Sequence, residues 1–277
     1  MKAALISACY DSGHFGTGMG AGPQAILAAG LVDRLTASGH DVVASDIGQV
    51  GDRQGREIAT GFAVCRAVSE AVSAARREDR LPVVLAGNCL TAAGAVAGEG
   101  AEAVVWFDQH GDLNTPETSA YGFLDGMAFA VTLGLCWKPM AAAIPGVHPV
   151  DPARCVLVDG RDLDPDEVDL LERLPIARAD CPAAAAAAVE RCSKVPTHIH
   201  LDLDIHDSQV LSVNRYAAPG GPEPQAVREA VCAVARAVPV SGLTITAYDP
   251  AFDVENRVPG AVAELLIEFL AANEAAR

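Results

Sequence analysis

Residues 104–116 of this chain read Val104-Val105-Trp106-Phe107-Asp108-Gln109-His110-Gly111-Asp112-Leu113-Asn114-Thr115-Pro116. The apolar run that opens them is typical of a buried strand. Three potential metal ligands follow at alternate positions: Asp108, His110 and Asp112. Because side chains of extended backbone repeat every two residues, we expect these three to leave the same face.

A second stretch, residues 197–207, ends in the same way. It reads Thr197-His198-Ile199-His200-Leu201-Asp202-Leu203-Asp204-Ile205-His206-Asp207. Its apolar and β-branched start leads to two carboxylates two positions apart, Asp202 and Asp204. Burial of an unpaired carboxylate is unfavourable, and a divalent cation removes that penalty. A solvated strand end with chance acidic residues would explain either stretch alone, but the pair favours a metal site.

The two stretches together offer four carboxylates and one imidazole, more than one open metal site needs from the protein. Such oxygen and nitrogen ligands suit Mn²⁺, with Zn²⁺ or Fe²⁺ as alternatives, and they differ from the thiolate-rich set of a structural zinc site. If one carboxylate bridges, they suit two ions about 3.5–4 Å apart.

The composition places the chain among globular proteins and excludes two classes of partner. A hydrophobic fraction of 51% argues against disorder, and a formal charge of −16 argues against binding to nucleic acid or anionic membranes. Uninterrupted apolar runs stay below the roughly 18 residues of a membrane span, and the N-terminus reads as a strand rather than a signal peptide. The eight cysteines form no CxxC pairs, which favours reduced thiols and a cytoplasmic location.

Strand-like runs alternate with Ala-rich helical runs along the whole chain. Strands are expected near residues 2–8, 41–45, 82–86, 103–107, 154–158, 197–203 and 242–247. Helices are expected near residues 22–38, 58–78, 90–98, 124–135, 165–173, 183–192, 222–237 and 259–274. This alternation predicts an α/β fold of three layers (αβα) with a mainly parallel central sheet, and residues 1–277 form a single domain without a linker or repeat.

Functional loops of an open parallel sheet lie beyond the carboxyl ends of its strands. Both acidic stretches lie there, together with the loops Gly87-Asn88-Cys89, 159–164 and Tyr248-Asp249-Pro250. Five loops are therefore expected to converge at one edge of the sheet.

Three motifs resemble the arginase–agmatinase (ureohydrolase) family. Residues 108–116 resemble its Asp-Ala-His-x-Asp-x-Asn signature, residues 202–207 its Asp-x-Asp-x-x-Asp signature, and residues 18–31 its Gly-Pro-x-x-Leu-x-x-Ala-Gly-Leu start. The resemblance implies an arginase-like fold with two Mn²⁺ ions, whose bridging hydroxide attacks the guanidinium carbon of a small-molecule substrate. It also implies a homo-oligomer, either a trimer or a hexamer.

Roles carried over from the resemblance fall on matching positions. Asp108 and Asp202 would bridge the two metals, Asp112 would complete one of them, and His110 with Asp204 the other. Asp204 would also hold the nucleophile and carry a proton. Asn114 and Asp164 are expected to contact substrate. His200, on the strand face that carries Asp202, is expected to donate a hydrogen bond to a ligand carboxylate.

Two departures from the family pattern concern metal and proton transfer. Cys89 stands where the family has a ligand His. Either its softer thiolate ligates and favours Zn²⁺ or Fe²⁺ at that metal, or it is a buried thiol and that metal is weakly held or absent. Asp125 replaces a proton-shuttling His and can act in its place if its pKa is raised.

Further departures concern the substrate. Tyr121 and Phe123 replace polar contacts to an amino-acid head, and Ser208 replaces a Pro. Ala247 replaces a Glu that pairs the guanidinium, which removes a charge-assisted contact. Asp249, two residues on, would point the same way in extended chain and could substitute.

These departures make plain arginase activity doubtful and favour a modified guanidine, amidine or formimino substrate. Asn114–Thr118 and the Cys in the His loop resemble the Nω-hydroxyarginine hydrolase branch. The sequence therefore predicts a metallohydrolase of C–N bonds. The alternative is a metal-poor family member that acts as a binding or regulatory protein.

Overall fold

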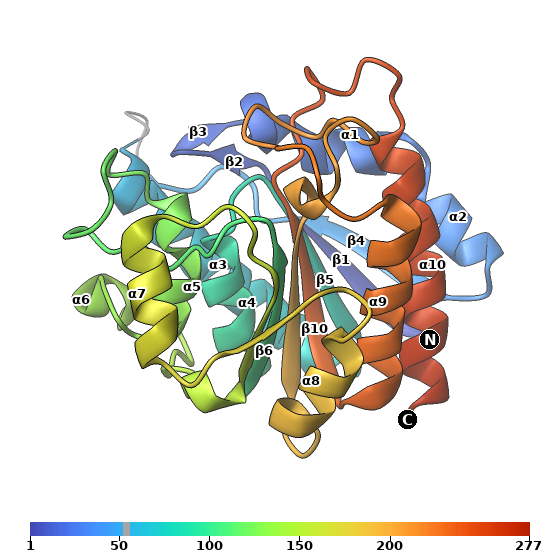
Figure 1. Ribbon diagram of the computed structural model, residues 1–277. Helices are drawn as coiled ribbons and strands as arrows, with labels where there is room; N and C mark the ends of the chain where they lie inside the picture. Colours follow the sequence, from blue (N-terminus) through green and yellow to red (C-terminus); the bar gives the residue numbers. More distant parts are fainter. Residues whose placement is uncertain (52–55) are drawn as a thin grey trace.

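A central parallel sheet lies between two layers of helices (Figure 1). In this computed structural model, which describes residues 1–51 and 56–277, eight strands form the sheet in the order β4-β1-β5-β10-β9-β6-β7-β8. Their bounds are β1 Lys2–Ala8, β4 Asp41–Asp46, β5 Leu81–Ala86, β6 Ala103–Asp108, β7 Cys155–Asp159, β8 Ala177–Ala179, β9 Thr197–Asp202 and β10 Val240–Thr246. All seven neighbouring pairs of this order are parallel, which confirms the predicted αβα fold.

Each face of the sheet has its own helical layer. Five helices pack together on one face: α1 Gly22–Ala28, α2 Leu31–Ala37, α8 Ala184–Cys192, α9 Pro224–Ala237 and α10 Val258–Ala275. The opposite face carries α3 Glu57–Arg77, α4 Thr91–Glu99, α5 Ala128–Thr132, α6 Lys138–Ala141 and α7 Pro165–Arg173. Side chains at alternate strand positions supply the apolar core between the sheet and each layer.

The seven predicted strands are present, but several helices differ from expectation. The helix expected over residues 22–38 is two helices, because the chain turns at Gly30 with a φ of +82°. The helix expected over residues 124–135 is a 3₁₀ turn, η2 Asp125–Met127, followed by the short α5. The helix expected from residue 222 begins at Pro224. Four short elements were not predicted: α6, the edge strand β8 and the hairpin of β2 (Tyr10–Asp11) and β3 (His14–Phe15), all of four residues or fewer.

One helix of the described residues, α3, is long and apolar enough to cross a membrane by length and composition. Its apolar side packs within the protein: Phe62, Cys65, Val68 and Val72 are fully buried, and α3 contacts α4, β1 and β5. This helix is therefore part of the core. The eight cysteines are buried free thiols, in agreement with the prediction.

The strand register aligns the polar residues of three central strands. His200 of β9 is the neighbour of Trp106 in β6 and of Thr244 in β10, and Asp202 is the neighbour of Thr246. Since side chains two positions apart share a face, these residues and Asp108 face the α3–α4 layer near the carboxyl edge of the sheet. The fold thereby brings both acidic stretches to one place.

Candidate metal centre

A cavity of about 270 Å³ opens at the carboxyl edge of the sheet. Its wall includes most of the predicted site residues: Cys89, His110, Asp112, Asn114, Tyr121, Phe123, Asp125, Asp164, Asp202 and Asp204. The loops that follow β5, β6, β7, β9 and β10 all contribute to it, as expected from the sequence. Asp108 lies directly behind this wall, where it is fully buried.

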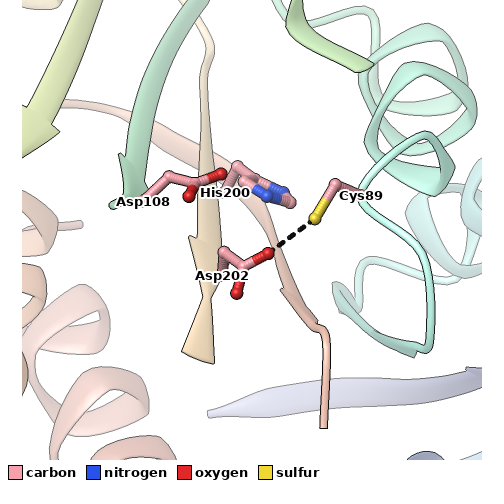
Figure 2. Close-up of side chains that lie close together, drawn as sticks. All are labelled: Cys89, Asp108, His200 and Asp202. Atoms are coloured by element: carbon pink, nitrogen blue, oxygen red, sulfur yellow. Dashed lines mark hydrogen bonds between the residues drawn. The ribbon is translucent and has the colours of Figure 1, made fainter. Parts of the chain in front are cut away.

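Two groups of potential ligands meet at Asp108. Asp108, His110 and Asp204 form one group, and Cys89, Asp108, His200 and Asp202 form the other. Within each group the ligand atoms all lie within 4.8 Å of one another. Figure 2 shows the second group, in which the four side chains converge from β6, β9 and the loop after β5. This arrangement is what two neighbouring ions with a shared carboxylate require.

Asp112 lies on the cavity wall outside both groups. His110 stays beside Asp108, but the expectation that Asp112 shares their face is wrong, because the extended backbone does not continue beyond Asp108. The strand ends at that residue, and Asp112 has a φ of +50°. The left-handed backbone buries the Asp112 carboxylate, and its Oδ2 has no hydrogen-bond partner among the described residues.

Burial and mutual repulsion disfavour the ionised form of the buried carboxyl groups on the cavity wall. Burial, together with the charge of neighbouring carboxylates, raises the pKa of Asp112 and Asp202 well above the ordinary value. Burial and the charge of Asp108 raise the pKa of Asp204 to about 7. A divalent cation would relieve this repulsion, so the donor set fits a metal site.

His110 is the positive partner of the first group. Its Nδ1 lies 3.4 Å from both Asp108 Oδ1 and Asp204 Oδ2. Burial alone would lower the pKa of His110, but the hydrogen bond to Asp108 and the charges of Asp204 and Asp108 raise it to about 9. Gln109 Nε2 lies 2.9 Å from His110 Nε2 and can only donate to it, so Nδ1 is the nitrogen of His110 that faces the two carboxylates.

Cys89 is the potential sulfur ligand of the second group. Its thiol donates a hydrogen bond of 2.8 Å to Asp202 Oδ2, and its sulfur is 3.1 Å from Thr246 Oγ1. Burial and the charge of Asp202 raise the pKa of this thiol well above the ordinary value. A metal ion would replace the proton that Cys89 and Asp202 share here, because a ligating thiol is deprotonated.

Asp125 is joined to the loop that carries Cys89. Its Oδ1 accepts a hydrogen bond of 2.8 Å from the Leu90 amide, and its Oδ2 accepts one of 3.0 Å from Asn88 Nδ2. Burial raises the pKa of Asp125 to about 6 even though these hydrogen bonds lower it. The carboxyl group thus meets the condition set for a proton carrier, and it also anchors the loop.

Asn114 and Asp164 form a hydrogen bond to each other on the cavity wall. Asn114 Nδ2 donates to Asp164 Oδ2 at 2.8 Å, while Asn114 Oδ1 accepts from Thr118. Asp164 begins α7 in a capping box with Glu167, and Glu167 also accepts a hydrogen bond from the Leu113 amide. The sequence analysis did not single out Glu167, although Asp164 and Glu167 have the spacing of a capping box.

Aromatic residues line the outer part of the cavity. Tyr121 is 96% exposed, and the rings of Phe123 and Tyr216 lie 5.6 Å apart. Tyr121 and Phe123 therefore lie where a substrate would enter.

Ala247 lines the cavity, but Asp249 does not. Ala247 has a φ of +66°, so the chain is not extended there and the two side chains do not point the same way. Asp249 is buried and accepts a hydrogen bond from the Ala251 amide. The structure thus gives Asp249 a local turn contact and does not bring it to the other predicted site residues.

Arg161 holds the loops of the site together, which the sequence did not indicate. Its guanidinium is bonded to Asp159, to Gln109 Oε1 at 2.8 Å, and to backbone carbonyls of the segment after β9. It also donates to the Ala218 carbonyl at 3.1 Å. An arginine offers several donors in fixed directions, but its acceptors here come from distant segments that sequence spacing cannot connect.

Comparison with known proteins places the chain in one family. The arginase family profile matches residues 1–272. The N(omega)-hydroxy-L-arginine amidinohydrolase of Streptomyces lavendulae is 34% identical over 183 residues, which cover 64% of this chain and 63% of that protein. Arginase of Bacillus subtilis (strain 168) is 30% identical over 176 residues, with 59% of each chain covered.

A solved structure extends the likeness to the whole fold. The crystal structure of arginase from Bacillus cereus superimposes with a TM-score of 0.87 at 25% identity, covering 97% of this chain and 98% of that chain. The sequence matches themselves span about three-fifths of the two curated relatives. On the match over residues 1–272, this chain belongs to the arginase family.

Proposed function

We propose that this protein is a metal-dependent hydrolase that cleaves a C–N bond of a guanidino-type compound. The observation that carries the proposal is the meeting of two ligand groups at Asp108, and both groups have members on the wall of a cavity large enough for a small molecule. Unpartnered buried atoms support it: among the described residues, Asp112 Oδ2, Asp204 Oδ1 and His200 Nε2 make no hydrogen bond. Members of the arginase family are binuclear metal enzymes, typically of manganese, which agrees with this donor set.

The metal ligands proposed from the sequence are Asp108, His110, Asp112, Asp202, Asp204 and Cys89. Two bound cations would supply an acidified water and polarise the substrate, since metal coordination lowers the pKa of water toward 7. Asp204, or its neighbour, would accept a hydrogen bond from the nucleophile and carry its proton. Asp125, with a pKa of about 6, would transfer a proton at the cavity wall.

The cavity wall favours a substrate less basic than a guanidinium. Ala247 presents a methyl group at the position where the family pattern has a Glu, so a charge-assisted contact is missing. A hydroxyguanidine, amidine or formimino group depends less on such a contact. The Streptomyces lavendulae relative is an N(omega)-hydroxy-L-arginine amidinohydrolase, which supports this class.

The substrate would bind between the metal ligands and the aromatic rim. Asn114 and Asp164 offer polar groups on one side, and Tyr121 and Phe123 offer apolar surface at the opening. We propose no substrate contact for Asp249, because it lies away from the cavity wall.

We also propose the domain organisation, the location and the assembly of this protein. We place residues 1–277 in one domain and the protein in the cytoplasm, as a homo-oligomer of three or six copies. Light scattering coupled to size-exclusion chromatography tests the assembly, and a monomer would contradict it.

Metal analysis tests the proposed function first. Protein purified without chelators and incubated with Mn²⁺ is expected to retain at least one ion per chain, and close to two where the position of Cys89 also takes Mn²⁺. The released products are then measured with arginine, agmatine, guanidinobutyrate and N(omega)-hydroxyarginine, and we expect release from the modified guanidine to exceed release from arginine. Less than a tenth of an ion per chain would overturn the hydrolase and leave a metal-poor binding or regulatory protein.

A further inference from the structure

A chain of hydrogen bonds runs through the core from Glu99 to His200. Glu99 Oε1 is 2.9 Å from His198 Nδ1, and the Ser241 hydroxyl donates to Glu99 Oε2 at 2.8 Å. His198 Nε2 is 3.1 Å from Thr244 Oγ1, and the same oxygen is 2.7 Å from His200 Nδ1. All five side chains are buried, and Gly242 leaves the room that the Glu99 carboxylate occupies.

The donor and the acceptor of each hydrogen bond in this chain can be assigned by starting from Glu99. An ionised carboxylate only accepts, so His198 Nδ1 carries a proton and donates it to Glu99. We take His198 to be the neutral imidazole, whose other nitrogen accepts, so that the Thr244 hydroxyl donates to His198 Nε2. A hydroxyl has a single proton, and Thr244 Oγ1 must therefore accept from His200 Nδ1.

This direction leaves the second nitrogen of His200 with a free lone pair. Among residues 1–51 and 56–277, Nε2 of His200 has no hydrogen-bond partner, although it is fully buried. The imidazole lies in the group with Cys89, Asp108 and Asp202 (Figure 2). The ring is also fixed in place, because it stacks on Trp106 with 3.7 Å between centroids.

We propose that His200 is a metal ligand through Nε2, and that Glu99, His198 and Thr244 hold it in the tautomer that can ligate. The inference rests on the metal-dependent hydrolase proposed above. The second metal would then have Cys89, Asp108, His200 and Asp202 as ligands, with His200 in place of the Asp112 expected from the resemblance. An imidazole from β9 would supply the nitrogen that the loop after β5 lacks, since that loop carries Cys89.

The ligand set changes the metal preference of this position. One thiolate, one imidazole and two carboxylates suit Zn²⁺, Fe²⁺ or Co²⁺ better than Mn²⁺, because sulfur is a soft ligand. The first group, Asp108, His110 and Asp204, has only nitrogen and oxygen atoms. The two positions would therefore differ in selectivity, and metal binding to the second would release the Cys89 proton.

Cobalt binding tests the ligand role without measuring turnover. Metal-free protein titrated with Co²⁺ is expected to bind two ions and to show a thiolate-to-cobalt charge-transfer band in the near ultraviolet. His200→Ala is expected to lose one ion together with that band, while the ion of the first group remains. Equal binding and an unchanged band in this variant would overturn the proposal.

Thr244 variants test the positioning role of the relay. Thr244→Val removes both hydrogen bonds of the hydroxyl at nearly constant shape, and we expect Co²⁺ affinity at the second position to fall about 10- to 100-fold. Thr244→Ser keeps the hydroxyl and is expected to bind as the natural protein does. Equal affinity in the Val and Ser variants would remove the relay from the proposal.

A measurement on the natural protein covers the case in which the variants do not fold. Nitrogen-15 spectra of the histidine rings are expected to show His200 protonated at Nδ1, and its Nε2 signal to shift when Zn²⁺ binds. If the metal binds and this signal stays in place, His200 is no ligand but the hydrolase proposal stands. If the natural protein binds no metal, both fail.

Discussion

The Asn88 side chain donates a hydrogen bond to Asp125 from a fixed orientation. Asn88 Oδ1 accepts from the Ser12 amide at 3.0 Å, so its Nδ2 must face Asp125, 3.0 Å away. Asp125 Oδ1 is held by the Leu90 amide at the same time. Both oxygens of Asp125 therefore support the loop on which Cys89 lies.

Asp125→Asn is expected to lower the turnover rate and to change its pH profile. The NH2 of the new amide would face a donor in either orientation, Asn88 Nδ2 or the Leu90 amide, and Asn88 cannot turn without losing Ser12. In the natural protein the pKa of Asp125 is about 6, so activity that needs its carboxylate should rise as the pH increases through that value. Rate measurements from about pH 5 to pH 8 should show that this rise is lost in the variant. A parallel profile at a lower rate would assign Asp125 a structural role only.

The metal-free protein is expected to become less stable as the pH rises from about 5 to 7.5. Burial raises the folded-state pKa of Asp125 to about 6 and of Asp204 to about 7, while the unfolded chain titrates near 4. Between these values the folded state binds more protons than the unfolded state, so stability falls with increasing pH. Thermal unfolding of the metal-free protein should show this fall.

Added Mn²⁺ is expected to reverse the trend. The cation offsets the repulsion between ionised carboxylates, so its gain in Tm should be larger at about pH 7.5 than at about pH 5. Asp112→Asn serves as the control, because it removes one raised-pKa carboxyl group and should flatten the slope of the metal-free protein. A metal-free protein that gains stability over this pH range would contradict the assignment.

Cys89→His is expected to shift the metal preference of the second position toward Mn²⁺. An imidazole replaces a soft thiolate there, and the other ligands are oxygen and nitrogen atoms. Competition between Zn²⁺ and Mn²⁺, followed by metal analysis, measures the change. Cys89→Ser is the matched control, since it keeps the size but removes the sulfur. An unchanged ratio in both variants would mean that Cys89 does not ligate.

The sequence predicted the sheet well because its core strands carry a strong local signal. The apolar runs before Asp108 and Asp202 correspond to β6 and β9, and both carboxylates reach the expected edge. Elements of two to four residues, such as β3 and α6, lack a period long enough to detect. The break at Gly30 was not predicted, because a glycine inside a helical pattern can either be tolerated within one helix or mark the end of a helix.

Side-chain placement was predictable only where the backbone was regular. The prediction that residues two positions apart share a face agrees with the contact between Asp108 and His110. It is wrong at Asp112 and Ala247, because both adopt positive φ values. The place of His200 in a ligand group depends on pairing with Trp106 and Thr244 from other strands. Such contacts arise from the sheet order, which spacing along one strand does not contain.

Arg161→Ala is expected to destabilise the protein and weaken the metal site. Its guanidinium is the common donor for Gln109 Oε1 and for the carbonyls of Asp204 and Ile205, so its removal takes this donor from both carbonyls and leaves Gln109 Oε1 with the Ala218 amide alone. Loss of one partner of a largely buried ion pair costs about 3 kcal/mol. Urea unfolding should measure this loss. Arg161→Lys keeps the charge beside Asp159 but offers fewer directed donors, so its stability should lie between that of the natural protein and that of Arg161→Ala. Equal stability of the natural protein and both variants would contradict the assigned role.

Ala247→Glu is expected to raise activity on arginine relative to N(omega)-hydroxyarginine. Ala247 lines the cavity, and a carboxylate there could pair with a guanidinium through charge-assisted hydrogen bonds. The left-handed backbone at this position already holds a Cβ atom, so the longer side chain adds little backbone strain. The ratio of kcat/KM for the two substrates should change by about tenfold or more, which corresponds to about 1.4 kcal/mol. Ala247→Gln has the same shape without the charge and should leave the ratio nearly unchanged; if it changes the ratio as much as Ala247→Glu does, shape rather than charge at residue 247 selects the substrate.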